Sequence, residues 1–363
     1  MTLFQFIKKL IFIKFDIFMP KVKKVLIYDN MTKITGYSQI FFKMDETAVF
    51  HNRFERINLS ILLKTFFKFN LLNFFQEYKK NYLNSVKPKI IYTSVDNNPA
   101  FYKLKKIYPK AIYISDQNGM RDNKFYNYSN NETKKNISYY CDYYFVFGSN
   151  DKNKFKKFIK GKIIIAGNAK NNNRKLNVKK NKKKVVFISS KLKINIQEIN
   201  KLKMIYNYCN RNHLKLYFLD RPNQNNSKYI LKNIPNIKFT YFSGKDLSKK
   251  EDRRKYLHLA SASLIIFSHS TLGYEFLSRK CRIVSYNHIK YKPNIKQNYP
   301  NDGPFWYCGN NEKKLEKKIN KVLTLKNKSW NKIAKSYSDK IMFYDKNNSI
   351  RKKIIKKYLT QGN

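Results

Sequence analysis

A short polar loop between an apolar run and a helical pattern holds the residues best suited to bind an anion. Residues 264–267 (LIIF) have the pattern of a buried parallel strand, and residues 268–271 (SHST) follow them. At a helix N-terminus, free backbone N–H groups and the helix dipole both favour negative charge. Ser270 and Thr271 can add hydroxyl donors, and Gly273 permits close approach of a ligand or of another backbone. The spacing predicts a phosphate site; the alternative is an ordinary capped strand-to-helix connection.

Two neighbouring side chains extend this candidate site. Glu275 lies one turn into the predicted helix, where its carboxylate could accept hydrogen bonds from ribose or sugar hydroxyls. His269 is a candidate for a phosphate contact or for a proton donor, and a hydrogen-bonded loop histidine is the alternative.

Polar residues also follow two predicted strands of the first half. Asp96 comes after the strand at 89–93, and Asp116 comes after the strand at 111–114. The loop after the second strand carries Asn118, Gly119 and Arg121, whose polar groups could bind substrate oxygens. Because open α/β sheets bind ligands beyond the carboxyl ends of their strands, this edge is a second candidate site.

Strand patterns alternate with helical patterns along both halves of the chain. The predicted strands are 25–28, 48–51, 89–93, 111–114, 143–148 and 162–168 in the first half, and 185–189, 214–219, 237–242, 264–267 and 283–284 in the second. This alternation predicts an α/β protein of two Rossmann-like, doubly wound domains facing across a cleft. We place the domains at 21–168 and 185–345, a polar linker at 169–184, and a basic C-terminal helix at 346–363.

The first 20 residues are rich in aromatic and aliphatic side chains, and lysines interrupt them. No apolar run approaches the roughly 20 residues that span a bilayer, and no small-residue cleavage site is present. The segment predicts an amphipathic helix that lies on an anionic membrane face or packs on the protein's own surface.

Composition points to an anionic partner. The chain has 363 residues and a formal net charge of +53, which favours nucleic acid, anionic lipid or a phosphorylated substrate. The lysine excess runs through every segment, so an A+T-rich coding habit is the favoured explanation. Four cysteines without zinc or disulfide spacing indicate a reducing, cytoplasmic compartment.

With these motifs in order, the sequence resembles bacterial surface carbohydrate (polysaccharide) biosynthesis proteins, which are GT-B-type glycosyltransferases related to CDP-glycerol-type transferases. The motifs that carry the resemblance are Asp96–Pro99, Gln117–Gly119 with Arg121, Gly167 with Lys170–Asn172, Arg221–Pro222, Ser270–Glu275 and Gly303–Trp306. Together they span most of the chain.

The resemblance implies transfer of a sugar from a nucleotide-activated donor to a glycan or lipid-linked acceptor. The C-terminal domain would hold the donor through Arg221, His269, Ser270, Thr271, Gly273 and Glu275. The N-terminal domain would hold the acceptor, with Asn118, Gly119 and Arg121 in the cleft. Such enzymes generally need no metal or other cofactor. A base must take the acceptor proton, and Asp96 and Asp116 are the candidates, although Asp96 is equally readable as a helix N-cap.

Two other functions stay open. A GT-B-fold sugar-nucleotide 2-epimerase also carries Ser, Gly and Glu at the start of this helix, and it needs no acceptor. A basic nucleic-acid-binding protein would explain the charge, but the chain has no recognisable nucleic-acid motif.

The enzyme would work in the cytoplasm, and the N-terminal segment could place it at the inner face of the cytoplasmic membrane.

Overall fold

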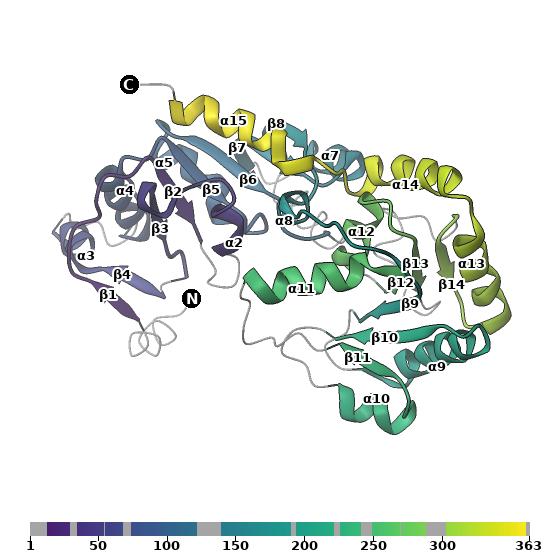
Figure 1. Ribbon diagram of the computed structural model, residues 1–363. Coiled ribbons are helices and arrows are strands. Elements are labelled where there is room, and N and C mark those ends of the chain that lie inside the picture. The colour runs from purple at the N-terminus through teal and green to yellow at the C-terminus, as the bar shows by residue number, and fades with distance from the viewer. Residues whose placement is uncertain are drawn as a thin grey trace.

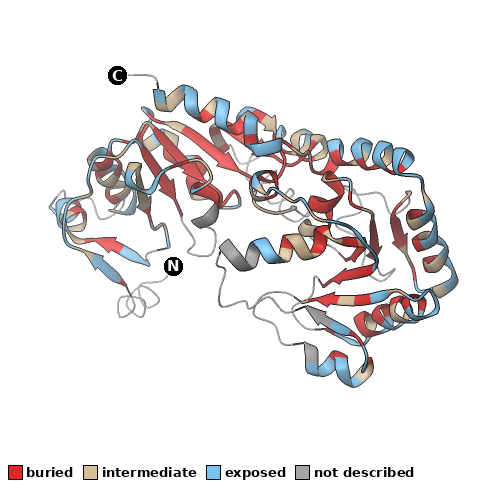
Figure 2. Cartoon of the chain, viewed as in Figure 1, coloured by how far each residue is buried: buried red, intermediate tan, exposed pale blue. Residues whose placement is uncertain are grey.

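Two α/β domains lie side by side and are joined by a short helical connection (Figure 1). The computed structural model describes residues 13–29, 35–53, 55–67, 74–121, 139–189, 194–220, 226–240, 249–268, 270–287 and 303–360. Each domain has a central sheet whose strands are mostly buried, with helices packed around it (Figure 2). Within the described residues, no helix is both long enough and apolar enough to cross a bilayer.

The sheet of the N-terminal domain has six parallel strands. Their order is β3 (Thr47–Phe50), β2 (Val25–Tyr28), β5 (Ile90–Thr93), β6 (Ile112–Asp116), β7 (Tyr139–Val146) and β8 (Ile159–Ile165). The chain runs outward from β2 to β3 and then returns to the other side at β5. The order of the strands therefore reverses between β2 and β5, and such a point is where open sheets place ligands.

The sheet of the C-terminal domain is built in the same way. Its parallel strands are, in order, β11 (Lys238–Thr240), β10 (Lys215–Leu219), β9 (Asn181–Ile188), β12 (Ala262–Phe267), β13 (Ile283–Asn287) and β14 (Trp306–Cys308). The reversal falls between β9 and β12. The predicted phosphate loop follows β12 and therefore lies at this reversal.

Helices connect the strands and cover the sheets. They are α2 (Thr35–Ser38), α3 (Leu59–Phe66), α4 (Phe74–Val86), α5 (Pro99–Ile107), α7 (Ser149–Phe155), α8 (Ala169–Asn173), α9 (Ile196–Arg211), α10 (Ser227–Asn233), α11 (Lys249–Ala260), α12 (Thr271–Ser278), α13 (Glu312–Thr324), α14 (Asn327–Ile341) and α15 (Ser349–Thr360), with 3-10 turns η1 (Met44–Glu46) and η3 (Lys346–Asn348). Asparagine caps several of them, including α5, where Asn98 accepts a hydrogen bond from the Ala100 amide. Asp96 is therefore not the cap of that helix.

The C-terminal helix belongs to the N-terminal domain. In Figure 1, α14 passes α7 and α15 then runs along the N-terminal sheet. Ile355 of α15 is buried in the same apolar cluster as Val25, Ile27 and Phe145. Within the segment that we predict as a basic helix, 346–363, residues 349–360 form α15, whose apolar side completes the core of the first domain, and residues 361–363 lie outside the described residues.

The connection between the domains is folded. Residues 169–184, which we predicted as a polar linker, contain helix α8 and the first residues of β9. Asn171 and Asn172 are fully buried. Gly167, just before α8, has a φ of 69°, and a Cβ there would collide with the Phe343 carbonyl oxygen. Glycine is needed at this position because the returning C-terminal segment passes against it.

The described part of the N-terminal segment is not helical. Residues Lys14–Asp16 form strand β1, which pairs in parallel with β4 (Arg56–Asn58). The Asp16 Oδ1 and the Arg56 Nη1 are 3.4 Å apart across this strand pair. The amphipathic helix that we predicted at 1–20 is therefore wrong for residues 13–20, and residues 1–12 lie outside the described residues.

His258 of α11 makes stability dependent on pH. Its Nδ1 lies 2.8 Å from the Lys184 Nζ, and burial, followed by the charge of Lys184, lowers its pKa from 6.5 to about 4. Because the folded protein favours neutral His258, this contribution to stability is complete above pH 6.5 and is lost as the pH falls towards 4. We expect His258→Gln to flatten this part of a plot of Tm against pH, whereas His213→Asn, at an exposed position, should leave the plot unchanged. Identical plots for the wild type and His258→Gln would contradict the assignment.

Candidate active site between the domains

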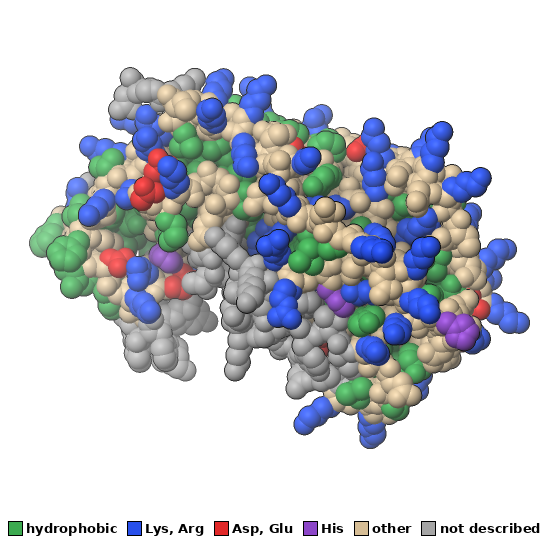
Figure 3. Space-filling model, viewed as in Figure 1, with side chains coloured by type: hydrophobic (Ala, Val, Ile, Leu, Met, Phe, Trp, Pro, Cys, Tyr) green, Lys and Arg blue, Asp and Glu red, His purple; other side chains and the backbone are tan. Residues whose placement is uncertain are grey.

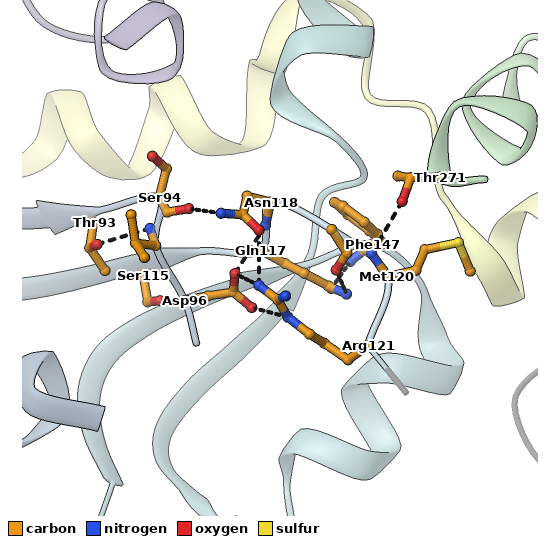
Figure 4. Close-up of polar contacts among 12 residues, drawn as sticks. Thr93, Ser94, Asp96, Ser115, Gln117, Asn118, Met120, Arg121, Phe147 and Thr271 are labelled. Atoms are coloured by element: carbon orange, nitrogen blue, oxygen red, sulfur yellow. Dashed lines mark hydrogen bonds and ion pairs between the residues drawn. The ribbon is translucent and has the colours of Figure 1, made fainter. Parts of the chain in front are cut away.

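The candidate site lies where the carboxyl ends of the two sheets approach each other. The loop after β6 in the N-terminal domain meets the start of α12 in the C-terminal domain (Figure 4). The Met120 amide lies 3.4 Å from the Thr271 Oγ1, and this contact joins positions 151 residues apart. The two sequence-predicted loops are therefore brought together.

Asp96 holds Arg121 at this junction. The Arg121 guanidinium donates to both carboxylate oxygens of Asp96, with an Nε–Oδ2 distance of 2.9 Å, and Tyr144 donates its hydroxyl to Oδ2 at 2.9 Å. Arg121 also donates to the Asn118 Oδ1 at 2.9 Å. Burial acts to lower the pKa of Arg121, but the charge and hydrogen bonds of Asp96 outweigh burial and raise that pKa, so the guanidinium stays charged.

This geometry does not fit Asp96 as the base that takes an acceptor proton. Its side chain has no solvent exposure, and the guanidinium, the tyrosine hydroxyl and the Asn118 amide occupy its oxygens. Asp96 instead orients Arg121, whose side chain keeps 14% exposure. Arg121 and Asn118, predicted as acceptor-side residues, lie together at the site (Figure 4). The predicted Gly119 belongs to the same loop, where its carbonyl accepts a hydrogen bond from Gln117.

Gln117 fixes the same loop from inside. Its Nε2 donates to the Asp151 Oδ2 at 3.0 Å and to the Gly119 carbonyl at 3.1 Å, while its Oε1 accepts from the Phe147 amide at 2.9 Å. These contacts tie the loop to the neighbouring strand β7 and to α7, so the Arg121 loop begins from a rigid base.

Asp116 has a structural partner that the local sequence does not show. Arg351 of α15 donates to both of its oxygens at 2.8 Å, and both side chains have no solvent exposure. The same guanidinium donates to the carbonyl oxygens of Ala166 and Gly167. A carboxylate enclosed in this way cannot reach an acceptor, so the prediction of Asp116 as a base is wrong.

Helix α12 presents its first turn to the N-terminal domain. Ser270 occupies the N-cap position with no side-chain capping bond, and both Ser270 and Thr271 are partly exposed. Gly273 is explained by packing, because a Cβ there would collide with the Phe267 ring. Its role is to let α12 lie close against β12, and the ligand contact that we predicted for it is not needed.

Glu275 lies one helical turn beyond Thr271, on the same side of α12. Tyr256 of α11 donates its hydroxyl to the Glu275 carboxylate. Burial raises the pKa of Glu275, whereas the Tyr256 hydrogen bond and the nearby lysines act in the opposite direction. The carboxylate is thus held among groups from several elements.

Among the described residues, Glu275 has four cations near it. We call Lys170, Arg174 and Lys255 the cationic cluster, and the fourth, Arg279, donates to the backbone carbonyls of Asn171 and Arg174. The Lys170 Nζ lies 5.0 Å from the centre of the Tyr37 ring, and the Arg174 guanidinium lies 5.1 Å from the centre of the Tyr256 ring. The Lys255 Nζ lies 5.7 Å from the same Tyr256 ring. Lys170 lies in α8 and Arg174 at its C-cap, both in the inter-domain connection, whereas Lys255 lies in α11 of the C-terminal domain. The cluster therefore depends on how the connection packs against the C-terminal domain.

The cationic cluster is electrostatically crowded. Burial lowers the pKa of Lys170, and the charge of Lys255 lowers it further. Burial likewise lowers the pKa of Arg174 and of Lys255. Positive charges that are desolvated and close together are suited to receive an anion with more than one negative charge.

Two predicted donor residues, Arg221 and His269, lie outside the described residues. Conversely, the sequence patterns did not single out Lys255, Arg174 and Tyr37. Asp29 was missed as well, although it follows β2 and accepts a 2.7 Å hydrogen bond from Asn98. Asp29 could have been found from the sequence, because ligand-binding residues of open α/β sheets follow the carboxyl ends of strands. No local pattern distinguishes Lys255 or Arg174 from the many other basic residues of the chain.

Two domains that each hold a six-stranded parallel sheet have the architecture of the GT-B fold. A family model described as "putative O-antigen biosynthesis protein" matches residues 114–201 and 196–359. The chain therefore belongs to this O-antigen biosynthesis family, which confirms the predicted resemblance to surface carbohydrate biosynthesis proteins.

Solved structures share the fold. A "putative UDP-N-acetylglucosamine 2-epimerase" from Listeria monocytogenes is 11% identical, with a TM-score of 0.52 over 95% of this chain and 98% of that chain. MnaA from S. aureus, solved with UDP, is 13% identical, with a TM-score of 0.52 over 93% and 97% of the two chains. The wall teichoic acid polymerase TagF is a weaker match, 13% identical with a TM-score of 0.48 over 94% and 91% of the two chains, and the fold assignment does not rest on it. No curated protein matches the chain.

Proposed function

We propose that this protein transfers a sugar from a nucleotide-activated donor to a glycan or lipid-linked acceptor during surface polysaccharide synthesis. One observation carries the proposal within the O-antigen family: a cationic cluster around the Glu275 carboxylate of α12. A nucleotide diphosphate has the charge that such a cluster would neutralise.

The donor would lie along the first turns of α12. Lys170, Arg174 and the α12 N-terminus would hold the diphosphate, and Ser270 and Thr271 would donate hydroxyl hydrogen bonds. Glu275 would accept from ribose hydroxyls with its carboxylate. Protein cations would stabilise the leaving diphosphate, so we propose transfer without a metal ion. Arg221 and His269 remain predicted donor contacts.

The acceptor would approach from the N-terminal domain. Asn118, the Gly119 backbone and Arg121 would bind its oxygens near the donor sugar. Asp96 would act by keeping Arg121 charged and in place. A lipid-linked acceptor would place the reaction at the cytoplasmic face of a membrane.

A screen against nucleotide sugars tests this function. We expect one class among UDP-, GDP-, CDP-, dTDP- and CMP-linked sugars to raise the Tm, because a ligand at 100 times its Kd adds about 2.7 kcal/mol to stability. Glu275→Gln should weaken the shift, and Lys332→Met on the exposed side of α14 should not. A shift with RNA and none with any nucleotide sugar would exclude the transferase.

Product analysis separates the transferase from the 2-epimerase. The protein would be incubated with the stabilising nucleotide sugar alone. Epimerisation needs no acceptor, so conversion of the sugar to its 2-epimer would contradict glycosyl transfer. Glycosyl transfer would be supported if the nucleotide sugar stays unchanged when incubated alone and is consumed only after a membrane extract is added.

A further inference from the structure

One end of the N-terminal domain exposes large apolar side chains, which we call the α3 face: Ile17, Phe18, Leu63, Phe66 and Phe67. Their exposed fractions are 67%, 87%, 58%, 59% and 80%. Figure 3 shows apolar side chains gathered at this end of the molecule, over the position of α3, with basic side chains around them.

The two segments that form the α3 face are held together. Asn58, the N-cap of α3, donates to the Phe18 carbonyl at 2.6 Å, and Ser60 donates to the Ile17 carbonyl. Beside them lies an open groove of about 470 Å³, lined by Phe15, Asp16, Ile17, Phe18, Pro20, Asn58 and Tyr82. The face is therefore one supported surface with a groove of mixed polar and apolar lining beside it.

Helix α3 is apolar on both sides. Ile61 and Thr65 are buried against the domain, while Leu63, Phe66 and Phe67 are exposed to solvent. With about 200 Å² available to each large side chain, the four most exposed members of the face present on the order of 600 Å². The largest apolar patch of a typical folded monomer is about 300–600 Å² and is often functional, so the α3 face is a candidate interaction surface.

We propose that the α3 face inserts into the surface of a bilayer that contains anionic phospholipids. Exposed lysines flank the face at Lys14, Lys21 and Lys64, where their long stems can reach the headgroups while the aromatic rings enter the apolar layer. Phenylalanine and leucine bordered by lysine are typical of surfaces that lie in a membrane interface.

Charge favours a bilayer over a second copy of this chain. Every copy carries a formal charge of +53, so two copies repel each other, whereas an anionic membrane attracts each of them. The positive charge is spread over the whole molecule, so it does not determine which face meets the bilayer. The exposed Phe side chains would determine it, because they are confined to the α3 face.

The biological reason for this contact rests on the proposed function. The face belongs to the domain that would hold the acceptor, and a lipid-linked acceptor lies in the membrane. Binding to vesicles does not depend on transferase activity. A protein with an intact donor site can fail to bind vesicles, and a protein without a donor site can bind them.

Vesicle sedimentation of the full chain tests the proposal. We expect binding to phosphatidylglycerol–phosphatidylcholine vesicles, with weaker binding to phosphatidylcholine alone and a decline with salt. The double variant Phe18→Ser/Phe67→Ser should weaken binding to the anionic vesicles by about tenfold or more, because two exposed aromatic anchors are removed. The matched control is Ile196→Ser, which changes a 56% exposed residue on α9 of the other domain and should bind as the wild type does.

Nucleotide-sugar thermal shifts on the same variants separate the two proposals. An unchanged shift in Phe18→Ser/Phe67→Ser shows that the variant is folded and its donor site intact. Wild-type vesicle binding by this variant would overturn the bilayer proposal, as would conversion of a wild-type dimer into a monomer with no change in vesicle binding. Loss of vesicle binding in Ile196→Ser to the same extent would also overturn it.

Discussion

Replacing Arg351 with alanine is expected to lower the free energy of unfolding by about 3–5 kcal/mol, because it leaves the Asp116 carboxylate buried without its partner. The pair has no solvent exposure, and Arg351 also satisfies two backbone carbonyls next to the inter-domain connection. Helix α15 should detach from the N-terminal sheet first. Urea unfolding would give the change in free energy, and hydrogen exchange in β6 would show where it acts.

Two further variants serve as references for the change in the free energy of unfolding. Arg211→Ala removes an exposed arginine that pairs with Glu312 and Glu316, and it should cost less than about 1 kcal/mol. The double variant Asp116→Leu/Arg351→Met should be more stable than Arg351→Ala, because it leaves no uncompensated charge in the core. Equal losses for Arg351→Ala and Arg211→Ala would show that the buried pair does not hold α15.

Replacing Lys170 with methionine is expected to weaken binding of the nucleotide sugar by about 10- to 100-fold, the range for loss of one charge-assisted hydrogen bond. Lys170 lies in the cationic cluster, where burial and Lys255 lower its pKa. Burial and Lys255 make the charged lysine costly in the ligand-free protein, the Glu275 carboxylate offsets part of that cost, and a bound diphosphate would offset more. Titration calorimetry with the nucleotide sugar found by the thermal screen would measure the change.

Stability distinguishes this functional role from a structural one. If Lys170 serves the ligand, Lys170→Met should leave the ligand-free protein as stable as the wild type or more stable, because one crowded charge is removed. Lys332→Met, on exposed α14, should change neither affinity nor stability. Unchanged affinity with reduced stability in Lys170→Met would assign the lysine to packing against Tyr37.

Alternation of strands and helices was readable from the sequence because buried parallel strands are short apolar runs. The runs predicted at 89–93, 111–114 and 264–267 correspond to β5, β6 and β12. The fold class and the surface-carbohydrate family are confirmed.

The candidate site was predicted in part. Strand ends and a helix N-terminus are local features, so the sequence brought Asp96, Arg121 and Thr271 to attention, and the fold places them around one junction. Lys170 was noted only as part of a motif. Its neighbours Arg174 and Lys255 could not be chosen among 76 lysines and arginines without knowing which of them face one another.

Asp96 and Asp116 show most clearly where local pattern stops being informative. Both follow a buried strand, and by local pattern they are equivalent. Tertiary structure separates them, because Arg121 reaches Asp96 from the next loop while Arg351 reaches Asp116 from 235 positions away. The amino-acid order alone specified the sheets and the loops at their edges, since those depend on hydrophobic period and turn chemistry. Only the tertiary structure decided that Asp116 is enclosed by Arg351 of α15, because burial and ion pairing depend on contacts between distant segments.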